Sequence, residues 1–485
     1  MLLEFLTDHL LALVIATLHL LGILASFHVL MHGRTAQGTI AWLLSLTFLP
    51  YVTVPLFLLF GSPKFTGYLA ARRSGGLDLH QLSETLHRPQ DLPQRALDPH
   101  HSPAALLAME QLAQMPFTRH NRCRLLIDGQ ATFNALFAGI EEATDYLLVQ
   151  FFIIRDDELG RALAERLCRR ARAGVRVYFL YDGVGCKDLP WSYIRRLEDA
   201  GIEVSPFSRR QARPAGLFDR LRLNFRNHRK IVVADGYRAW VGGHNVGVEY
   251  QGRHPRLSPW RDTHVQLDGP AALACQVAFV EDWHWATGGV PALCWQPRPA
   301  ADPGHRVLIV PSGPADELET CALLFVQAIN SARRRLWIVS PYFVPDAQVV
   351  AALQLAVLRG VDVRILLPDR PDHLMVWLAS YAYLSETDPL GIKLYRYRRG
   401  FLHQKVVLID DDLSLIGTAN FDNRSFRINF EITVVVADGQ FVARVATMLE
   451  NDFAHSVRAT LQDYLRRPLP FRLACRAARL LAPIL

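Results

Sequence analysis

The sequence contains one short motif twice, and this duplication constrains the fold more than any other feature. The motif H-x-K-x4-D occurs in HRKIVVAD at residues 228–235 and in HQKVVLID at residues 403–410. Each copy leads into a glycine turn that ends in an asparagine, GGHN at 242–245 and GTAN at 417–420. Chance rarely produces two matches with the same downstream turn. We therefore expect two homologous halves, each carrying one motif.

Segments around the motifs repeat as well, in the same order. YLLVQFFII (146–154) resembles LWIVSPYFV (336–344), and both are short apolar runs typical of buried strands. RRARAGVRVYFLYD (169–182) resembles LQLAVLRGVDVRILLPD (353–369), with a helix end, a glycine stop and a strand. The remaining pairs are AGIEVSPF (200–207) with LGIKLYRY (390–397) and WRDTHVQLDGPAALACQVAFVEDW (260–283) with NFEITVVVADGQFVARVATMLENDF (429–453).

Strands that alternate with helices predict an α/β fold. We expect two α/β halves, at residues 117–300 and 301–485, with mixed sheets flanked by helices and related by a pseudo-twofold axis. A linker is expected at residues 63–116, with one short helix around 104–114. The first 62 residues form a separate segment.

That segment contains two stretches without Asp, Glu, Lys or Arg, at residues 10–31 and 39–60. As a helix each would be about 33 Å long, enough to cross a membrane. We expect a transmembrane helical hairpin; two buried core helices are the alternative. A cleaved signal peptide fits poorly, because the first nine residues carry Glu4 and Asp8 and no Lys or Arg.

Basic residues around the two stretches predict their orientation. Lys64, Arg72 and Arg73 follow the second stretch, whereas Arg34 alone lies between the two. The positive-inside rule then places the N-terminus and everything after residue 61 in the cytoplasm.

Charge and cysteine content narrow the partner classes only in part. The net charge of +7 suits an anionic lipid surface, nucleic acid or a phosphate-bearing substrate. The chain has seven cysteines and no C-x-x-C pair, so neither a disulfide framework nor a zinc site is expected. A reducing compartment fits this pattern.

The motif histidines suit phosphoryl transfer. One imidazole can attack phosphorus to form a covalent phosphohistidine. A second can protonate the leaving oxygen and later deprotonate the incoming alcohol. His228 and His403 are the candidates, and the sequence is symmetric with respect to their roles.

Other motif residues suit the phosphate itself. Lys230 and Lys405, with Asn245 and Asn420, would hold the non-bridging oxygens and stabilise the charge of the transition state. No Asp/Glu cluster with metal-ligand spacing accompanies them, so neither a catalytic metal nor another cofactor is predicted.

Each imidazole also needs an acceptor that orients it. Asp262 and Glu431 occupy equivalent places in WRDTH and NFEIT, and both are predicted to serve in this way. Asp235 and Asp410 belong to the motif but end their strands, so they are either part of the site or structural. His264 lies two residues from Asp262; for such a histidine a core or surface position is the alternative to a direct role.

With these motifs the chain resembles the phospholipase D superfamily, and within it the bacterial cardiolipin synthases with two N-terminal spans and two motifs. The resemblance extends over nearly the whole chain and includes AWLLSLTFLP, WRDTH, VPSGP, SPYFVPD and NFE. One departure is that the usual serine after the motif glycine is Gly243 in the first half and Thr418 in the second. The missing hydroxyl at Gly243 puts a side-chain phosphate contact there in doubt.

The resemblance implies an integral enzyme of the bacterial inner membrane that makes cardiolipin and glycerol from two molecules of phosphatidylglycerol. It implies His228 as nucleophile and His403 as general acid and base, the commoner assignment in the family. The expected partners are phosphatidylglycerol and an anionic membrane surface, without nucleic acid. The alternatives are phosphatidylethanolamine as donor, a phospholipase D hydrolase, a superfamily nuclease and a silent membrane scaffold.

Basic stretches would contact the membrane. Residues 209–229 hold seven arginines among apolar residues, residues 396–399 read RYRR, and the tail at 466–485 is basic and apolar. We expect them to rest on anionic headgroups, with an ordinary solvated face as the alternative.

Overall fold

The computed structural model describes residues 2–33, 36–61, 68, 103–207, 225–302 and 304–482. Contacts divide the chain into two compact units. The first, the helical unit, contains the N-terminal helices. The second, the α/β unit, contains residues 103–207 and 226–482.

The helical unit consists of α1 (Leu2–His32), α2 (Ala36–Phe48) and α3 (Pro50–Phe60). Within α1 the stretch Ala12–His32 has a mean hydropathy of 2.1 and is long enough to cross a membrane. It is the only helix of this kind in the part of the chain that the structure describes. An apolar helix over the first predicted span is therefore present.

The second predicted span is not one helix, and this corrects the sequence-based expectation. It breaks at Leu49 into α2, of 13 residues, and α3, of 11 residues. These are about 20 and 16 Å long, too short to cross a membrane. The physical reason is Pro50, which cannot donate a backbone hydrogen bond and disfavours helical geometry at the preceding Leu49.

Aromatic contacts give the direction of these helices. The rings of His19 and Tyr51 lie 5.3 Å apart, and those of His28 and Phe57 6.1 Å apart, so α3 runs parallel to α1. The rings of Trp42 and Phe57 are 5.3 Å apart, as expected where α2 and α3 are antiparallel. The chain therefore reverses at Leu49, and α3 ends at the end of the helical unit where α1 also ends.

The α/β unit begins with α6 (Pro103–Ala113), the short helix that was predicted within the linker. The strands of the first half are β1 (Thr118–Ile127), β2 (Tyr146–Phe151), β3 (Arg176–Tyr181), β4 (Glu203–Pro206), β5 (Arg226–Asn227), β6 (Ile231–Ala234), β7 (Arg238–Gly242), β8 (Trp260–Arg261) and β9 (Thr263–Asp268). Its helices are α7 (Asp128–Glu142), α8 (Glu158–Arg172), α9 (Trp191–Glu198) and α11 (Ala271–Thr287).

The second half repeats this order. Its strands are β10 (His305–Ser312), β11 (Arg335–Val339), β12 (Phe343–Val344), β13 (Asp362–Pro368), β14 (Lys393–Tyr397), β15 (Phe401–Leu402), β16 (Val406–Ile409), β17 (Leu413–Gly417), β18 (Phe421–Asp422), β19 (Asn429–Ala437) and β20 (Ser456–Ala459). Its helices are α12 (Thr320–Ser331), α13 (Ala347–Leu358), α14 (Leu374–Ala382), α15 (Leu384–Thr387), α16 (Asn423–Arg427), α17 (Gly439–Ala454), α18 (Leu461–Leu465) and α19 (Leu469–Leu480).

One sheet of 16 strands runs through both halves of the described α/β unit. From its centre the order is β1-β9-β7-β6-β2-β3-β4 on one side and β10-β19-β17-β16-β11-β13-β14 on the other. These orders are equivalent strand for strand, and β1 pairs antiparallel with β10 where the halves join. The arrangement matches the predicted pair of α/β halves with a pseudo-twofold axis between them.

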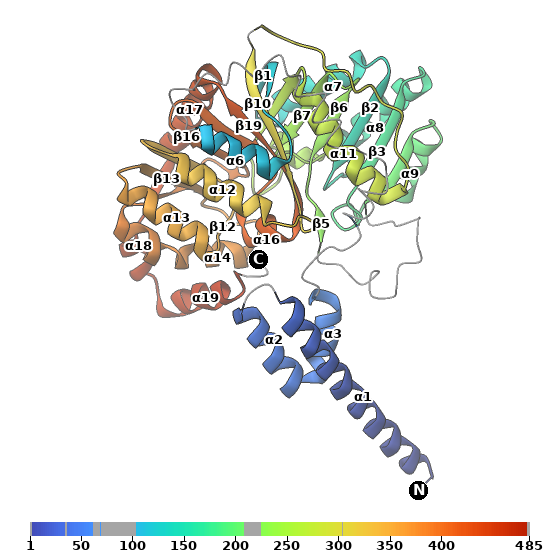
Figure 1. Ribbon diagram of the computed structural model, residues 1–485, viewed down its shortest axis with the longest axis vertical. Helices are drawn as coiled ribbons and strands as arrows, with labels where there is room; N and C mark the ends of the chain where they lie inside the picture. Colours follow the sequence, from blue (N-terminus) through green and yellow to red (C-terminus); the bar gives the residue numbers. More distant parts are fainter. Residues whose placement is uncertain are drawn as a thin grey trace. The chain divides into compact units, whose positions relative to one another are not determined.

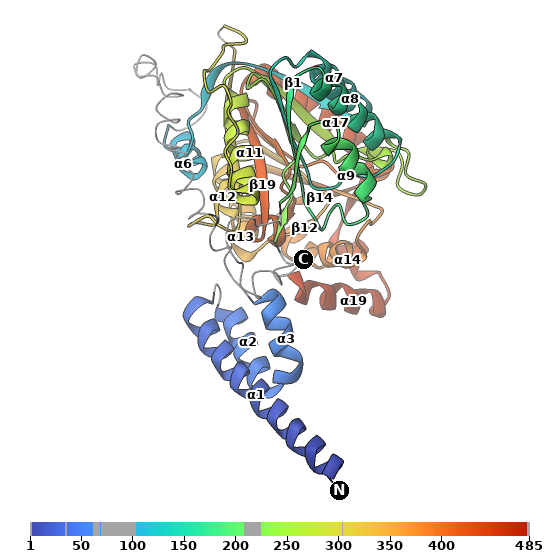
Figure 2. The same ribbon diagram turned by 90° about the vertical axis from the view of Figure 1, so that its right-hand side faces the viewer.

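Helices cover both faces of the sheet (Figures 1 and 2). α11 lies on the same face as α12 and α13, and α17 lies on the same face as α7 and α8. Because both faces are covered, the motif strands β6 (IVVA) and β16 (VVLI) are buried at every residue. The two motifs therefore belong to central strands of the core.

The predicted glycine stops lie where they were expected. Gly174 after α8 and Gly360 after α13 adopt φ values of +93° and +86°. This left-handed geometry ends a helix with little strain only at glycine. It turns the chain into β3 and β13, the strands next to β2 and β11.

Candidate active site

Two short strand pairings bring the motifs of one half to the carboxylates of the other. β5 pairs parallel with β19, with Asn227 opposite Phe430. β8 pairs parallel with β15, with Arg261 opposite Leu402. The next residue on each strand is a motif histidine or a carboxylate. His228 thus comes to lie beside Glu431, and His403 beside Asp262.

Each imidazole hydrogen-bonds a carboxylate from the opposite half. Nδ1 of His228 donates to Glu431 and lies 2.9 Å from Oε2. Nδ1 of His403 donates to Oδ2 of Asp262 at 2.7 Å. Because Nδ1 carries the proton, Nε2 of each neutral ring is an acceptor, and Lys405 Nζ lies 3.1 Å from Nε2 of His403. Sequence analysis predicted both carboxylates as orienting residues, but not that each histidine would pair with the carboxylate of the opposite half.

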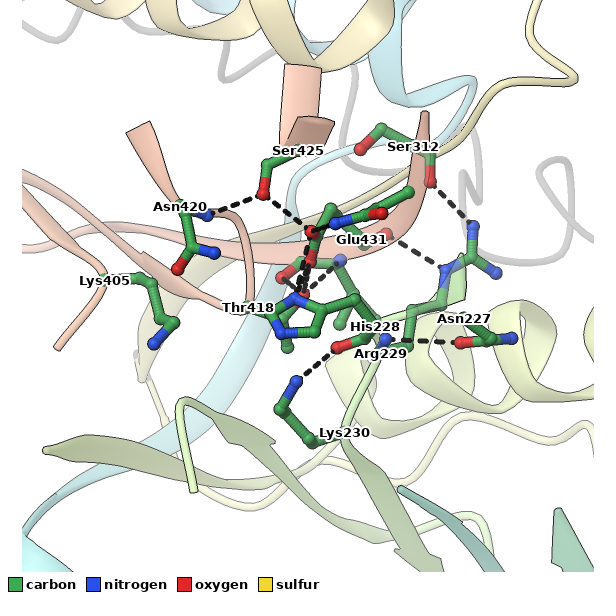
Figure 3. A network of polar contacts seen from close by, with 12 residues as sticks. Asn227, His228, Arg229, Lys230, Ser312, Lys405, Thr418, Asn420, Ser425 and Glu431 are labelled. Carbon is green, nitrogen blue, oxygen red and sulfur yellow. Dashed lines mark hydrogen bonds and ion pairs between the residues drawn. The ribbon is translucent and has the colours of Figure 1, made fainter. Parts of the chain in front are cut away.

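Glu431 is surrounded by hydrogen-bond donors (Figure 3). Thr418 Oγ1 donates at 2.6 Å, Ser425 Oγ at 2.8 Å and Asn429 Nδ2 at 3.2 Å. Burial raises the pKa of Glu431, but the charge and hydrogen bond of His228 oppose it and hold the pKa below its usual value. The carboxylate is therefore ionised and fixed in place.

Asp262 is held differently, and this explains the departure at Gly243. Its Oδ1 accepts from the backbone N–H of Thr263 at 2.8 Å. A Cβ atom at Gly243 would lie 2.0 Å from that same oxygen. The carboxylate of Asp262 thus fills the space that the Thr418 side chain takes in the second half, and only glycine fits.

The motif lysines are almost completely buried. Lys230 Nζ donates to the carbonyl oxygen of His228 at 2.6 Å, and Lys405 Nζ donates to that of His403 at 2.5 Å. Burial lowers the pKa of Lys230 to about 7 and that of Lys405 to about 8, although nearby carboxylates oppose this. In Figure 3 Lys230 and Lys405 flank the ring of His228.

The motif asparagines lie at the same site but have different partners. Asn245 Oδ1 accepts from the N–H of Ile153 at 3.1 Å, and its Nδ2 donates to the hydroxyl of Tyr250 at 3.0 Å. The side-chain oxygen of Asn420 is buried and has no hydrogen-bond partner among the residues that the structure describes. The Asn245 amide is thus hydrogen-bonded at both its oxygen and its nitrogen, whereas within the described part of the chain the oxygen of the Asn420 amide is not.

Both histidines are largely uncharged in this environment. Burial lowers the pKa of His228 to about 4, against the opposing charge of Glu431. Burial, and then the charge of Lys405, lower the pKa of His403 well below its usual value. A neutral ring is the form of histidine that can act as a nucleophile.

Aromatic side chains that the motifs do not predict line the site. Phe152 stands edge-on to His228 with ring centres 5.0 Å apart, and Trp260 lies 5.2 Å from His403. Tyr250 is 6.2 Å from the same ring. Phe152 and Trp260 lie in the repeated segments YLLVQFFII and WRDTH, and this repetition is the sequence feature that could have identified them.

The motif aspartates lie at the other end of their strands. Asp235 accepts from the backbone N–H groups of Thr144, Asp145 and Tyr146 at 2.8–2.9 Å. Asp410 accepts from those of residues 333–335 at 2.8–3.0 Å. The four-residue strands β6 and β16, each roughly 13 Å long, lie between these aspartates and the histidines. Their contacts are those of turn-forming residues.

His264 is buried and packs against another buried histidine. Its Nδ1 lies 3.1 Å from Nδ1 of His244, another buried ring. Burial lowers the pKa of both to about 3. These are the features of a core histidine pair.

The predicted basic surface is described only in part. Residues 208–224 lie outside the described residues, and with them most of the arginine-rich stretch. Arg396 is not on the surface, which corrects the expectation for RYRR: it is buried and donates to Ser380 Oγ at 2.8 Å. Among the described residues no group of three or more His, Cys, Asp or Glu side chains is placed to hold a metal ion.

Comparison with known proteins agrees with this architecture. The family described as "Cardiolipin synthase, PLD-like domain" matches residues 136–251 and 325–453. A second family, "Phospholipase D-nuclease N-terminal", matches residues 20–62. Among solved structures, phosphatidylserine synthase of Haemophilus influenzae has the same fold, with a TM-score of 0.58 and 15% identity over 79% of this chain and 100% of that one.

Curated relatives match over the full length. Cardiolipin synthase A of Pseudomonas putida strain F1 is 51% identical over 96% of this chain and 97% of its own. Cardiolipin synthase A of Pseudomonas fluorescens strain Pf-5 is 47% identical over 99% of this chain and 100% of its own. With both phospholipase D-like halves matched and half of all positions identical, this chain belongs to the cardiolipin synthase family.

Proposed function

We propose that this protein is a cardiolipin synthase, a phosphatidyltransferase that joins two molecules of phosphatidylglycerol and releases glycerol. The observation that carries the proposal is the pair of His–carboxylate contacts, His228 with Glu431 and His403 with Asp262, beside two buried lysines. Two imidazoles, each oriented by a carboxylate, are what a two-step displacement at phosphorus needs.

In the first step Nε2 of His228 attacks the phosphorus of one phosphatidylglycerol. The N–P bond forms and the P–O bond to glycerol breaks. His403, which the bound anionic lipid converts to the imidazolium, gives its Nε2 proton to the leaving oxygen and becomes neutral. Glu431 holds the nucleophilic ring and balances the positive charge that develops on it. The product is a phosphatidyl-histidine and free glycerol.

In the second step His403 takes the proton from the terminal hydroxyl of a second phosphatidylglycerol. The hydroxyl oxygen attacks phosphorus, the N–P bond breaks, and cardiolipin leaves. One phosphodiester replaces another, so the reaction needs no nucleotide. The same histidine serves as acid and then as base, as microscopic reversibility requires.

His228 as nucleophile fits the charges around the two rings. Glu431 accepts three hydrogen bonds besides that of His228, whereas Asp262 accepts one besides that of His403. A carboxylate with fewer donors stabilises an imidazolium more strongly. His403 is therefore the better proton carrier, particularly once an anionic phosphodiester offsets the charge of the lysines.

Lys230, Lys405, Asn245 and Asn420 would contact the non-bridging phosphoryl oxygens. The two lysines are buried, and each ammonium donates to the backbone carbonyl oxygen of the motif histidine two residues before it. Buried, preorganised donors stabilise transition-state charge more than solvated ones do. Asp235 and Asp410 would contribute only by fixing the ends of the motif strands.

The function is tested by mass spectrometry of lipids after full-length protein is mixed with phosphatidylglycerol vesicles, with and without labelled phosphatidylethanolamine. Unlabelled cardiolipin and free glycerol from phosphatidylglycerol alone are expected. Cardiolipin that forms only with phosphatidylethanolamine and carries its label would change the donor. Phosphatidic acid as sole product would make the enzyme a hydrolase.

We also infer how the chain lies in the bacterial inner membrane. α1 would cross once, and α2 and α3 would enter the membrane and return to the same side. Arg34, Lys64, Arg72 and Arg73 then all follow the crossing, and the first nine residues carry no Lys or Arg. The positive-inside rule places the catalytic region in the cytoplasm and the N-terminus outside it.

A further inference from the structure

On the basis of the function proposed above, we propose that Tyr342 and Asp372 bind the glycerol group of phosphatidylglycerol beside His403. They would hold the leaving glycerol in the first step and the glycerol of the acceptor lipid in the second. Neither residue belongs to the H-x-K-x4-D motifs.

The backbone fixes Tyr342 next to the second motif. The preceding strand β11 pairs with β16, with Val339 opposite Val406, one residue after Lys405. Ser340 Oγ accepts from the N–H of Phe421, one residue after Asn420, at 2.9 Å. Phe343 pairs with Phe421 in the parallel strands β12 and β18, so the preceding residue, Tyr342, lies at the position opposite Asn420.

Asp372 is held at the same place. Tyr342 donates its hydroxyl hydrogen to Oδ2 at 2.6 Å, and the N–H of His373 donates to Oδ1 at 2.7 Å. The side chain is 20% exposed, so the carboxylate keeps an accessible edge. Among the described residues it has no Lys or Arg ion pair, and only His373 Nε2 approaches, at 3.9 Å.

The charge of Asp372 acts on both His403 and Lys405. Burial and Lys405 lower the pKa of His403, and the negative charge of Asp372 opposes them. The charge of Asp372 opposes the lowering of the Lys405 pKa in the same way. Burial raises the pKa of Tyr342 well above its usual value, so its hydroxyl stays protonated and remains a donor.

The first half has an apolar pair where the second has this polar one. Aligning YLLVQFFII with LWIVSPYFV puts Phe152 opposite Tyr342, and aligning FLYDGVG with LLPDRPD puts Gly185 opposite Asp372. A Cβ atom at Gly185 would lie 2.9 Å from the ring of Phe152, so no carboxylate can occupy that place. At these two equivalent positions the first half is apolar and the second half is polar.

This asymmetry identifies the chemistry of the ligand. An anion repels the phosphate, so Asp372 is not part of the phosphate cradle, but a carboxylate accepts strong hydrogen bonds from hydroxyl groups. The leaving glycerol has two free hydroxyls, and the acceptor headgroup keeps one besides the attacking one. Water lacks the additional hydroxyl that Asp372 would bind, so the pair would favour lipid alcohol over hydrolysis.

The test supplies full-length enzyme in phosphatidylglycerol vesicles with labelled glycerol and 1-propanol together. Phosphatidylglycerol carrying the label, phosphatidylpropanol and phosphatidic acid are quantified. Asp372→Asn is expected to lower the glycerol-to-propanol ratio about tenfold or more, because a charge-assisted hydrogen bond is lost. Tyr342→Phe is expected to lower it several-fold, and the cardiolipin-to-phosphatidic-acid ratio should fall in parallel.

Asp411→Asn, which changes an exposed carboxylate in the β16–β17 turn, is the matched control and should leave both ratios unchanged. Loss of folded protein would lower all three products equally and leave their ratios unchanged. Equal falls in all three products would therefore mean a structural role and overturn the proposal. Wild-type protein that makes only phosphatidic acid would contradict the proposed function itself, whereas wild-type cardiolipin synthesis with an unchanged ratio in Asp372→Asn would contradict only the glycerol site.

Discussion

His228 and Glu431 are 203 residues apart in the chain, yet Nδ1 of the imidazole lies 2.9 Å from Oε2 of the carboxylate. The contact exists because β5 pairs with β19 across the two halves. A nucleophile from one half is thus oriented by the other. Neither half contains a complete pair alone, which ties activity to the correct joining of both.

The roles of the two histidines can be separated with a substrate whose leaving group needs no proton. Phosphatidyl-p-nitrophenol should react with His403→Ala in a burst of p-nitrophenolate and leave a phosphatidyl group on His228. His228→Ala should give no burst. Peptide mass spectrometry at alkaline pH, where phosphohistidine survives, would locate the adduct. An adduct on His403 in the His228→Ala protein would reverse the roles.

Gly243 should not tolerate a side chain. Gly243→Ala places a methyl group 2.0 Å from Asp262 Oδ1 and must displace the carboxylate that orients His403. A shift of about 1 Å in such a group lowers the rate roughly a hundredfold. The measurement is initial cardiolipin formation, with Thr418→Ser as the control because it keeps the hydroxyl on Glu431. Full activity in Gly243→Ala would show that catalysis does not require the Asp262 carboxylate in its present position.

Activity should depend on pH through the buried lysines. Lys230 and Lys405, with pKa values of about 7 and 8, are charged only below those values. His228, with a pKa of about 4, is neutral only above it. We expect kcat/KM for phosphatidylglycerol to rise above pH 4 and to fall as pH rises through 7 to 8. A rate that increases steadily up to pH 9 would show that the lysines need not be charged.

Much of the fold follows from local sequence signals, because β2, β3, β6 and their counterparts are short apolar runs. The strand pairings that join the two halves do not follow from local sequence signals. The bridges β5–β19 and β8–β15 are two residues long, and no local pattern marks them. Tyr342 and Asp372 were also missed, since their counterparts are Phe152 and Gly185 and no repeated residue pointed to them.

The second apolar stretch shows where composition misleads. Residues 39–60 pass any test of length and hydropathy for a membrane span, and Pro50 near their middle is compatible with a kinked crossing or with a reversal. Only contacts distinguish the two. Pairing of His19 with Tyr51 and of His28 with Phe57 requires that α3 run alongside α1 in the same direction.

That direction predicts which side of the membrane each terminus occupies. An epitope tag before Leu2 should be cleaved by protease added to intact spheroplasts, whereas a tag after Leu485 should be cleaved only after lysis. A hairpin of two spans would protect both tags. Pro50→Leu provides a matched variant, because joining α2 to α3 restores a helix of about 33 Å. In that protein the N-terminal tag should become protected, and a tag protected already in the wild type would contradict the single crossing.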